Sequence, residues 1–200
     1  MINKRVFCFI ICVMKYISYT KIRDVKSPSR GTSASAGIDF YVPNKFDDDF
    51  INTLWDNFWV NDMKVKDTMS MTSFDLIQRN LDDVFICIPP FHRIAIPMGV
   101  RTTMAKGTAL VGFNKSGVAM KKGLILGPCL VDSDYTGELM CGLINTNNAQ
   151  VIVHAGEKIL QMVHIEYNTL GIGELTNENY ADMTKDSERG EGRFGSTNKQ

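Results

Sequence analysis

Two aspartates and an aromatic ring fall within one short turn at residues 130–138, which read LVDSDYTGE. An aspartate held at the end of a strand can orient and deprotonate water, so Asp132 is a candidate general base. Tyr135 follows three residues later, where its ring can pack against a sugar or a base. Turns rich in aspartate also occur in ordinary β-hairpins, and this segment alone does not separate the two interpretations.

A second segment offers hydrogen-bond donors for phosphate oxygens. Residues 112–118 (GFNKSGV) combine the Lys115 ammonium, the Ser116 hydroxyl and the backbone amides around Gly117. Such a combination suits phosphate groups. The segment lacks the spacing of a P-loop. By itself it fits a phosphate-binding turn and an ordinary turn equally well.

Three further segments carry weaker signals. Asp39, in SAGIDF, fits a turn residue that precedes a strand. Gln161 lies among apolar neighbours in GEKILQM, so it is either satisfied by the backbone or directed at a ligand. The polar, glycine-rich tail is typical of a disordered end, although Phe194 is out of place in a linker.

The elements that would position these segments are short strands. Apolar runs bounded by Gly, Pro or Asn occur at residues 84–88, 93–96, 109–113, 138–144, 150–153 and 159–167. This spacing is typical of a β-barrel or a jelly roll. Helices do not alternate with these strands, which disfavours a doubly wound sheet.

Residues 44–83 differ from the rest of the chain. Apolar side chains recur there at helical spacing, after a run of aspartates that favours a helix N-terminus. They are Phe50, Ile51, Leu54, Trp55, Phe58 and Trp59. Ser73 is placed to cap a second helix with Phe74, Ile77 and Leu81. We expect a separable helical insertion packed on the barrel. The alternative is a surface for a protein partner.

The composition is that of a soluble globular protein. The chain has 200 residues, 44% of them hydrophobic and 22% charged, which indicates one domain with or without an insertion. Its formal net charge of +0 provides no overall basic field for nucleic acid. The cysteines show no paired spacing and no ligand pattern with the histidines, so we expect buried free thiols rather than disulfides or a zinc site. They are Cys8, Cys12, Cys87, Cys129 and Cys141.

The apolar run Val6–Met14 is shorter than the ~20 residues that span a bilayer, and no small-residue cleavage site follows it. We expect residues 1–14 to form an extra strand or a disordered leader, with Met14 as an alternative start. Residues 15–185 would form the barrel domain and residues 186–200 a mobile arm. The expected location is the cytoplasm, the nucleus or, for a viral protein, the host cytoplasm, without membrane or nucleic-acid partners.

Together, and in this order, the five segments resemble the motifs of the trimeric dUTPase family. The resemblance runs from about Ile17 to Gln200, apart from the insertion, and includes the strand at Ile94–Val100. It implies an all-β, jelly-roll-like barrel and a homotrimer with active sites shared between subunits. It also implies hydrolysis of dUTP to dUMP and pyrophosphate, which limits uracil incorporation into DNA and supplies dUMP for dTMP synthesis.

The resemblance also implies roles for individual residues. Asp132 would activate the water that attacks the α-phosphorus, and Tyr135 would stack under the deoxyribose. Asp39 would orient a water bound to Mg²⁺, which the triphosphate carries. Backbone groups of residues 127–132 and Met140 would read uracil. The implied substrate-binding residues are Lys115, Ser116, Gly117, Gly127, Cys129, Val131, Tyr135, Met140, Gln161, Arg189, Phe194, Gly195, Ser196 and Thr197.

The chain departs from the family's pattern at three positions. Lys115 stands where the family usually has Arg, which loses a bidentate contact, and Cys129 and Arg193 stand where it usually has Gly. None of these changes removes a catalytic group. A dCTP deaminase, which has a similar fold, is the nearest alternative but lacks the Asp-Ser-Asp-Tyr pattern. A regulatory protein on this scaffold, contacting partners through residues 44–83, is the alternative from another class.

Overall fold

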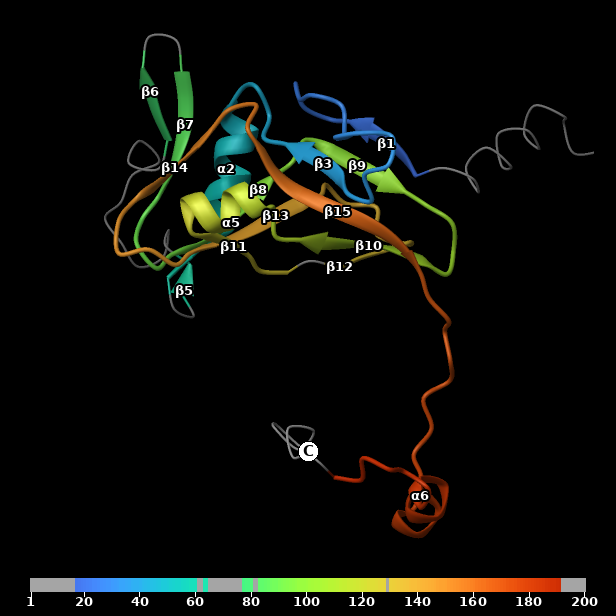
Figure 1. Ribbon diagram of the computed structural model, residues 1–200. Coiled ribbons are helices and arrows are strands. Elements are labelled where there is room, and N and C mark those ends of the chain that lie inside the picture. Colours follow the sequence, from blue (N-terminus) through green and yellow to red (C-terminus); the bar gives the residue numbers. More distant parts are fainter. Residues whose placement is uncertain (1–16, 61–62, 65–76, 81–82, 129, 192–200) are drawn as a thin grey trace, which may run out of the picture. The chain divides into compact units, whose positions relative to one another are not determined.

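The computed structural model (Figure 1) describes residues 17–60, 63–64, 77–80, 83–128 and 130–191. The expected leader at residues 1–14 lies outside these ranges. The chain divides into two compact units, Met1–Tyr167 and Asn168–Gln200. The expected boundary after residue 185, between the barrel domain and a mobile arm, stays a prediction.

Two five-stranded antiparallel sheets form the first unit's framework. One has the order β12 (Leu130–Asp132), β10 (Thr108–Phe113), β15 (Lys158–Glu166), β3 (Ile38–Tyr41) and β2 (Ser29–Arg30). The other has the order β11 (Leu124–Leu126), β13 (Met140–Asn145), β8 (Arg93–Pro97), β4 (Phe58–Val60) and β5 (Met63–Lys64). Most neighbours are not consecutive in sequence, so the chain crosses repeatedly between strands, as in a jelly roll.

Two smaller sheets complete the unit. β1 (Ser18–Lys21) pairs with β9 (Val100–Thr103), and β7 (Asp83–Ile88) lies between β6 (Ile77–Asn80) and β14 (Val151–His154). Alternation sets the buried face: in β9, Val100 and Thr102 point inward and Arg101 and Thr103 outward. The strands expected from sequence correspond to β7, β8, β10, β13, β14 and β15, and the expected all-β class is confirmed.

A single hydrophobic core joins the two large sheets. Phe40 of β3 and Leu110 of β10 come from one sheet, Ile96 of β8 and Leu143 of β13 from the other, and each is at most 2% exposed. Such close packing fixes the loops that connect the sheets, because small displacements of core side chains are costly.

The helix expected in residues 44–83 is present as α2 (Asp48–Asp56). Asp47 caps it, with Oδ1 accepting a hydrogen bond from the Phe50 amide at 2.8 Å. Phe50 and Leu54 are 0% and 1% exposed and belong to the main core. The helix is therefore part of the barrel core, and its buried face is not a free partner surface. The expected separability of residues 44–83 as a whole stays a prediction.

The helical prediction is wrong for three other residues of this segment, Phe58, Trp59 and Ile77. Phe58 and Trp59, assigned to the helix face, lie in β4 and pair with Ile94 and Arg93 of β8. Ile77, assigned to a second helix, lies in β6, which pairs with β7. Strand pairing with an available edge overrides the helical spacing in both places. The other residues of that predicted helix, Ser73, Phe74 and Leu81, lie outside the described residues.

Two remaining expectations concern the cysteines and the membrane. Cys87 and Cys141 are buried free thiols as expected, and burial raises the pKa of each. Cys8, Cys12 and Cys129 lie outside the described ranges. No helix in the described part of the chain is long and apolar enough to span a bilayer.

The second unit contains α6 (Asn177–Thr184), capped by the Thr176 hydroxyl. None of its residues is buried. Its stability therefore comes from local hydrogen bonds rather than from burial of an apolar face.

Candidate functional site

Asp39 forms the centre of a polar cluster at one end of the sheet that contains β3. Its side chain is only 3% exposed. Oδ1 lies 3.1 Å from Lys115 Nζ and 3.4 Å from Gln161 Nε2, and Oδ2 lies 2.8 Å from Lys158 Nζ. Lys115 and Gln161, which come from two other predicted motifs, therefore both contact the Asp39 carboxylate.

The charge of Asp39 is stabilised by its two lysines. Burial raises the pKa of the carboxyl, but hydrogen bonds and charges from Lys158 and Lys115 outweigh burial, and the pKa lies below the ordinary 3.8. The pKa of Lys158 is raised, mainly by its hydrogen bond to Asp39. The Asp39 carboxylate and the Lys158 ammonium are therefore both charged at neutral pH.

Lys158 is the member of this cluster that sequence reasoning missed. It lies three residues before Gln161, and strict strand alternation places such residues on opposite faces. A register shift between Lys158 and Leu160 breaks the alternation, so both side chains reach Asp39. The basic residue within the GEKILQ segment was the available signal, but the bulge is not visible in the sequence.

Gly37 makes room for Gln161 in this cluster. A Cβ at Gly37 would lie within about 2.6 Å of Gln161 Nε2 and closer still to its Cδ and Cγ, so any other residue would displace the amide. The glycine of the first motif and the glutamine of the fourth are therefore one packing unit.

The candidate phosphate-binding segment, residues 112–118, runs into the first turn of α5 (Ser116–Lys122). Lys115 occupies its N-cap and makes no side-chain cap hydrogen bond, so backbone amides of the first turn lack that partner. Ser116 and Gly117 are exposed, and a Cβ at Gly117 would meet nothing within 4 Å among the described residues. Packing does not require glycine here, and the open space suits an approaching ligand.

Asp132 lies at the end of β12, paired with Ala109 of β10, and is exposed. The Tyr135 amide donates to the Asp132 carbonyl at 3.2 Å, which closes the turn. The Tyr135 hydroxyl donates to the Glu138 carbonyl at 2.9 Å, and the ring lies where a Cβ at Gly137 would be. Tyr135 is 44% exposed, so its side chain remains partly accessible.

Residues 127–128 and 130–131 cross from one large sheet to the other. The Gly127 amide donates to the Gly142 carbonyl of β13 at 2.8 Å, whereas Val131 pairs with Leu110 of β10. A cavity of about 190 Å³ lies against this crossing. It is lined by Pro128, Leu130, Val131, Asp132, Tyr135, Leu139, Met140, Leu160 and Met162. The candidate base and the aromatic ring therefore line a largely apolar cavity.

The two groups of candidate residues lie at opposite ends of β10. Asp132 pairs with Ala109, whereas Gln161 of the Asp39 cluster pairs with Phe113. Four residues of strand separate these positions by about 13 Å. One chain thus presents two separate groups of candidate residues: Asp132 and Tyr135 at one end of β10, and the cations and amides around Asp39 at the other.

The remaining candidates fall elsewhere. Arg189 is exposed and belongs to the second unit. Cys129, Phe194, Gly195, Ser196, Thr197 and the departure at Arg193 lie outside the described residues.

The dUTPase family model matches residues 71–198 of the chain. The deoxyuridine 5'-triphosphate nucleotidohydrolase of Hydrogenobaculum sp. is 34% identical over 119 residues, which cover 58% of this chain and 78% of that protein. The protein of the same name from Desulfitobacterium hafniense is 36% identical over 124 residues, covering 60% of this chain and 78% of that protein.

Solved structures agree on the fold. A variant of the Staphylococcus bacteriophage 80alpha dUTPase with dUpNHpp aligns with a TM-score of 0.64 and 16% identity, covering 92% of this chain and 99% of that chain. The Streptococcus mutans dUTPase aligns with a TM-score of 0.53 and 20% identity, covering 78% of this chain and 99% of that chain. The match over more than half of the sequence, with the motifs placed as described, establishes that the chain belongs to the dUTPase family.

Proposed function

We propose that the protein is a dUTP diphosphatase, which hydrolyses dUTP to dUMP and pyrophosphate. The observation that carries the proposal is the turn that places exposed Asp132 and the partly accessible Tyr135 side chain beside one cavity. Its relatives carry the name deoxyuridine 5'-triphosphate nucleotidohydrolase, and the bacteriophage 80alpha structure has dUpNHpp with it. In a cell this reaction would limit uracil incorporation into DNA and supply dUMP for dTMP synthesis.

Asp132 would act as the general base. Its exposed carboxylate would accept a proton from the water that attacks the α-phosphorus, a role worth ~10²–10⁴-fold in rate. The Tyr135 ring would pack against the deoxyribose and leave no room for a 2′-hydroxyl.

The crossing between the sheets would recognise the base. Uracil and cytosine differ in donor and acceptor at position four, so fixed backbone groups around Gly127, Val131 and Met140 can distinguish them. Binding the wrong base would leave such groups unpaired, which is costly. The apolar walls of the 190 Å³ cavity suit a flat ring.

Lys115, Ser116, Gly117 and Gln161 would hold the phosphates. Because this cluster and Asp132 lie at opposite ends of β10, we propose that an active site combines Asp132 and Tyr135 of one subunit with the Asp39 cluster of another. A closed homotrimer satisfies this arrangement with a head-to-tail interface repeated three times. Residues 186–200, with Arg189, Phe194, Gly195, Ser196 and Thr197, would form an arm that closes over the nucleotide.

Mg²⁺ would accompany the substrate rather than occupy a protein site. The dUTPase of phage phi11 of S. aureus coordinates a structural Mg(II) ion. In the described part of this chain, no three His, Cys, Asp or Glu residues are grouped to hold a metal. Both Asp39 oxygens accept from lysine ammonium groups, and the role of Asp39 in orienting a magnesium-bound water through a further hydrogen bond stays a prediction. A cation on the triphosphate would neutralise part of its charge.

The decisive experiment compares pyrophosphate release from dUTP with ammonia release from dCTP, each with magnesium. We expect dUTP hydrolysis and no deamination. The matched variant is Asp132→Asn, which keeps shape and hydrogen bonding but removes the base, and it should lower turnover by ~10²–10⁴-fold while still binding nucleotide. Near-normal turnover by this variant would refute the assignment of Asp132, and ammonia release would refute the proposed reaction.

A further inference from the structure

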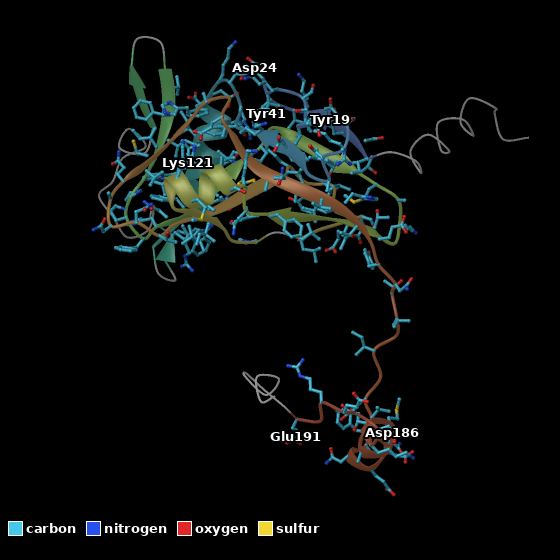
Figure 2. All side chains as sticks on the ribbon, viewed as in Figure 1. Tyr19, Asp24, Tyr41, Lys121, Asp186 and Glu191 are labelled. Carbon is cyan, nitrogen blue, oxygen red and sulfur yellow. The ribbon has the colours of Figure 1, made fainter. Side chains whose placement is uncertain are left out.

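The Arg23 side chain joins three parts of the first unit. It follows β1, and its side chain is 8% exposed. Nε and Nη2 donate to the two carboxylate oxygens of Glu138 at 2.8 and 3.0 Å. Nη2 also lies 2.8 Å from Asp49 of α2, and Nη1 donates to Asp47, the cap of that helix, at 3.5 Å. Asp24, which follows Arg23 in the chain, is labelled in Figure 2.

Glu138 connects this pair to the turn that carries Tyr135. Its Oε1 accepts a second hydrogen bond, from the Gly99 amide at 2.7 Å, and its side chain is 13% exposed. Its own carbonyl accepts the Tyr135 hydroxyl at 2.9 Å. The next residue, Leu139, exchanges backbone hydrogen bonds with Met98 and Val100 at 2.9 Å. The position of the Glu138 carbonyl is therefore fixed from both sides.

The Arg23–Glu138 pair has the features of a strong interaction. It is bidentate, both side chains are largely shielded from water, and the guanidinium has further partners in Asp47 and Asp49. Removal of one member leaves the other as a buried charge with fewer partners, so the local backbone must rearrange. Within residues 130–138, the side chain bonded directly to the Glu138 backbone is that of Tyr135. It would be the first to move with that backbone.

We propose that Arg23 and Glu138 are positioning residues for sugar recognition. The bidentate pair fixes the Glu138 backbone, and the Glu138 carbonyl holds the Tyr135 ring where it excludes a 2′-hydroxyl. The N-terminal turn of α2 takes part, because Asp47 and Asp49 orient the same guanidinium. This inference rests on the proposed dUTP hydrolysis and on the proposed contact of Tyr135 with the deoxyribose.

The test measures kcat and KM for dUTP and UTP in wild type, Arg23→Met, Tyr135→Phe and the double variant. Tyr135→Phe keeps the ring but removes its bond to the Glu138 carbonyl. Each single variant should lower the dUTP to UTP ratio of kcat/KM at least about fivefold. Because both changes break the same link, the double variant should lower the ratio no further than the stronger single variant.

Two other variants separate positioning from stability. Arg23→Lys keeps the positive charge but cannot donate two parallel hydrogen bonds to Glu138. It should therefore restore part of the dUTP to UTP ratio of kcat/KM that Arg23→Met loses. Lys45→Met is the matched control: Lys45 pairs with Asp24 at 3.7 Å on the surface, with an 80% exposed side chain, and its loss should leave the ratio unchanged. Should Arg23→Met be insoluble, Arg23→Lys and Glu138→Gln provide the same comparison with Tyr135→Phe.

The outcomes distinguish the inference from the proposed function. A wild-type protein that does not hydrolyse dUTP would refute the proposed function. An active wild type with an unchanged ratio in folded Arg23 variants would overturn the inference alone. Effects of Arg23→Met and Tyr135→Phe that multiply in the double variant would also overturn it, because they would show independent action.

Discussion

At the scale of the single residue, the buried Asp39 carboxylate links the site to pH. Its pKa in the folded protein is lowered below the ordinary 3.8, so its contribution to stability is complete above that value and is lost as the pH falls through the folded pKa. Asp39→Asn should therefore destabilise the protein by about 1–3 kcal/mol at pH 7, and this difference should shrink below pH ~3.8.

Urea unfolding of both proteins at pH 7 and pH 3 measures this effect. Other carboxyl groups titrate in the same range, but they are common to both proteins, so the difference isolates Asp39. A stability difference that is the same at both pH values would contradict the charged pairing with Lys115 and Lys158.

At the scale of the element, α2 is part of the barrel core. Leu54 is 1% exposed, and Leu54→Ala should lower the free energy of unfolding by about 2–5 kcal/mol. Asn52, on the exposed face of the same helix, is the control, and Asn52→Ala should change stability by about 0.5 kcal/mol or less. Equal, small effects of both substitutions in thermal or urea unfolding would instead favour a separable helix.

The C-terminal arm is an element of the opposite kind. The described residues of α6 and of the segment up to residue 191 are exposed, so truncation before Arg189 removes no buried side chain among them. The melting temperature should remain nearly unchanged. Turnover should fall at least roughly tenfold, about 1.4 kcal/mol of barrier, because the truncated protein would lack the proposed closing arm. Equal dUTP turnover by truncated and full-length protein would remove the arm from the mechanism.

The strands and motifs were predictable because they depend on local signals. Apolar runs bounded by turn residues predicted the strands β7, β8 and β10. The chemistry of the side chains alone suggested Asp132 and Tyr135 as candidates. The bulge that brings Lys158 beside Gln161 was not predictable, because it depends on the register of β15 with β3. The pairing of β4 and β6 with distant strands was also hidden, since helical spacing in residues 44–83 competes with edges that only the tertiary structure provides.

At the scale of the whole molecule, the separation of the two groups of candidate residues along β10 predicts complementation between subunits. Asp132→Asn and Lys115→Met should each be poorly active alone. Refolded together at equal amounts, they should form mixed trimers in which about a quarter of the sites join an intact Asp132 to an intact Lys115. Dilution from denaturant followed by dUTP hydrolysis measures this recovery. Activity no greater than the mean of the two separate variants would place both residues in one subunit's site.

The crossing at Gly127–Pro128 has a consequence for local unfolding. The Gly127 amide is bonded to β13 in one sheet, and the Val131 backbone is bonded to β10 in the other, a few residues away. A fluctuation that frees either strand must also disturb the wall of the cavity of about 190 Å³, so the two sheets open as one cooperative unit there. Amide hydrogens at the two ends of the crossing should then exchange with solvent deuterium at similar rates. A nucleotide bound against this wall would slow hydrogen exchange at both ends of the crossing. The ligand would then stabilise the contact between the two sheets as well as serve as substrate.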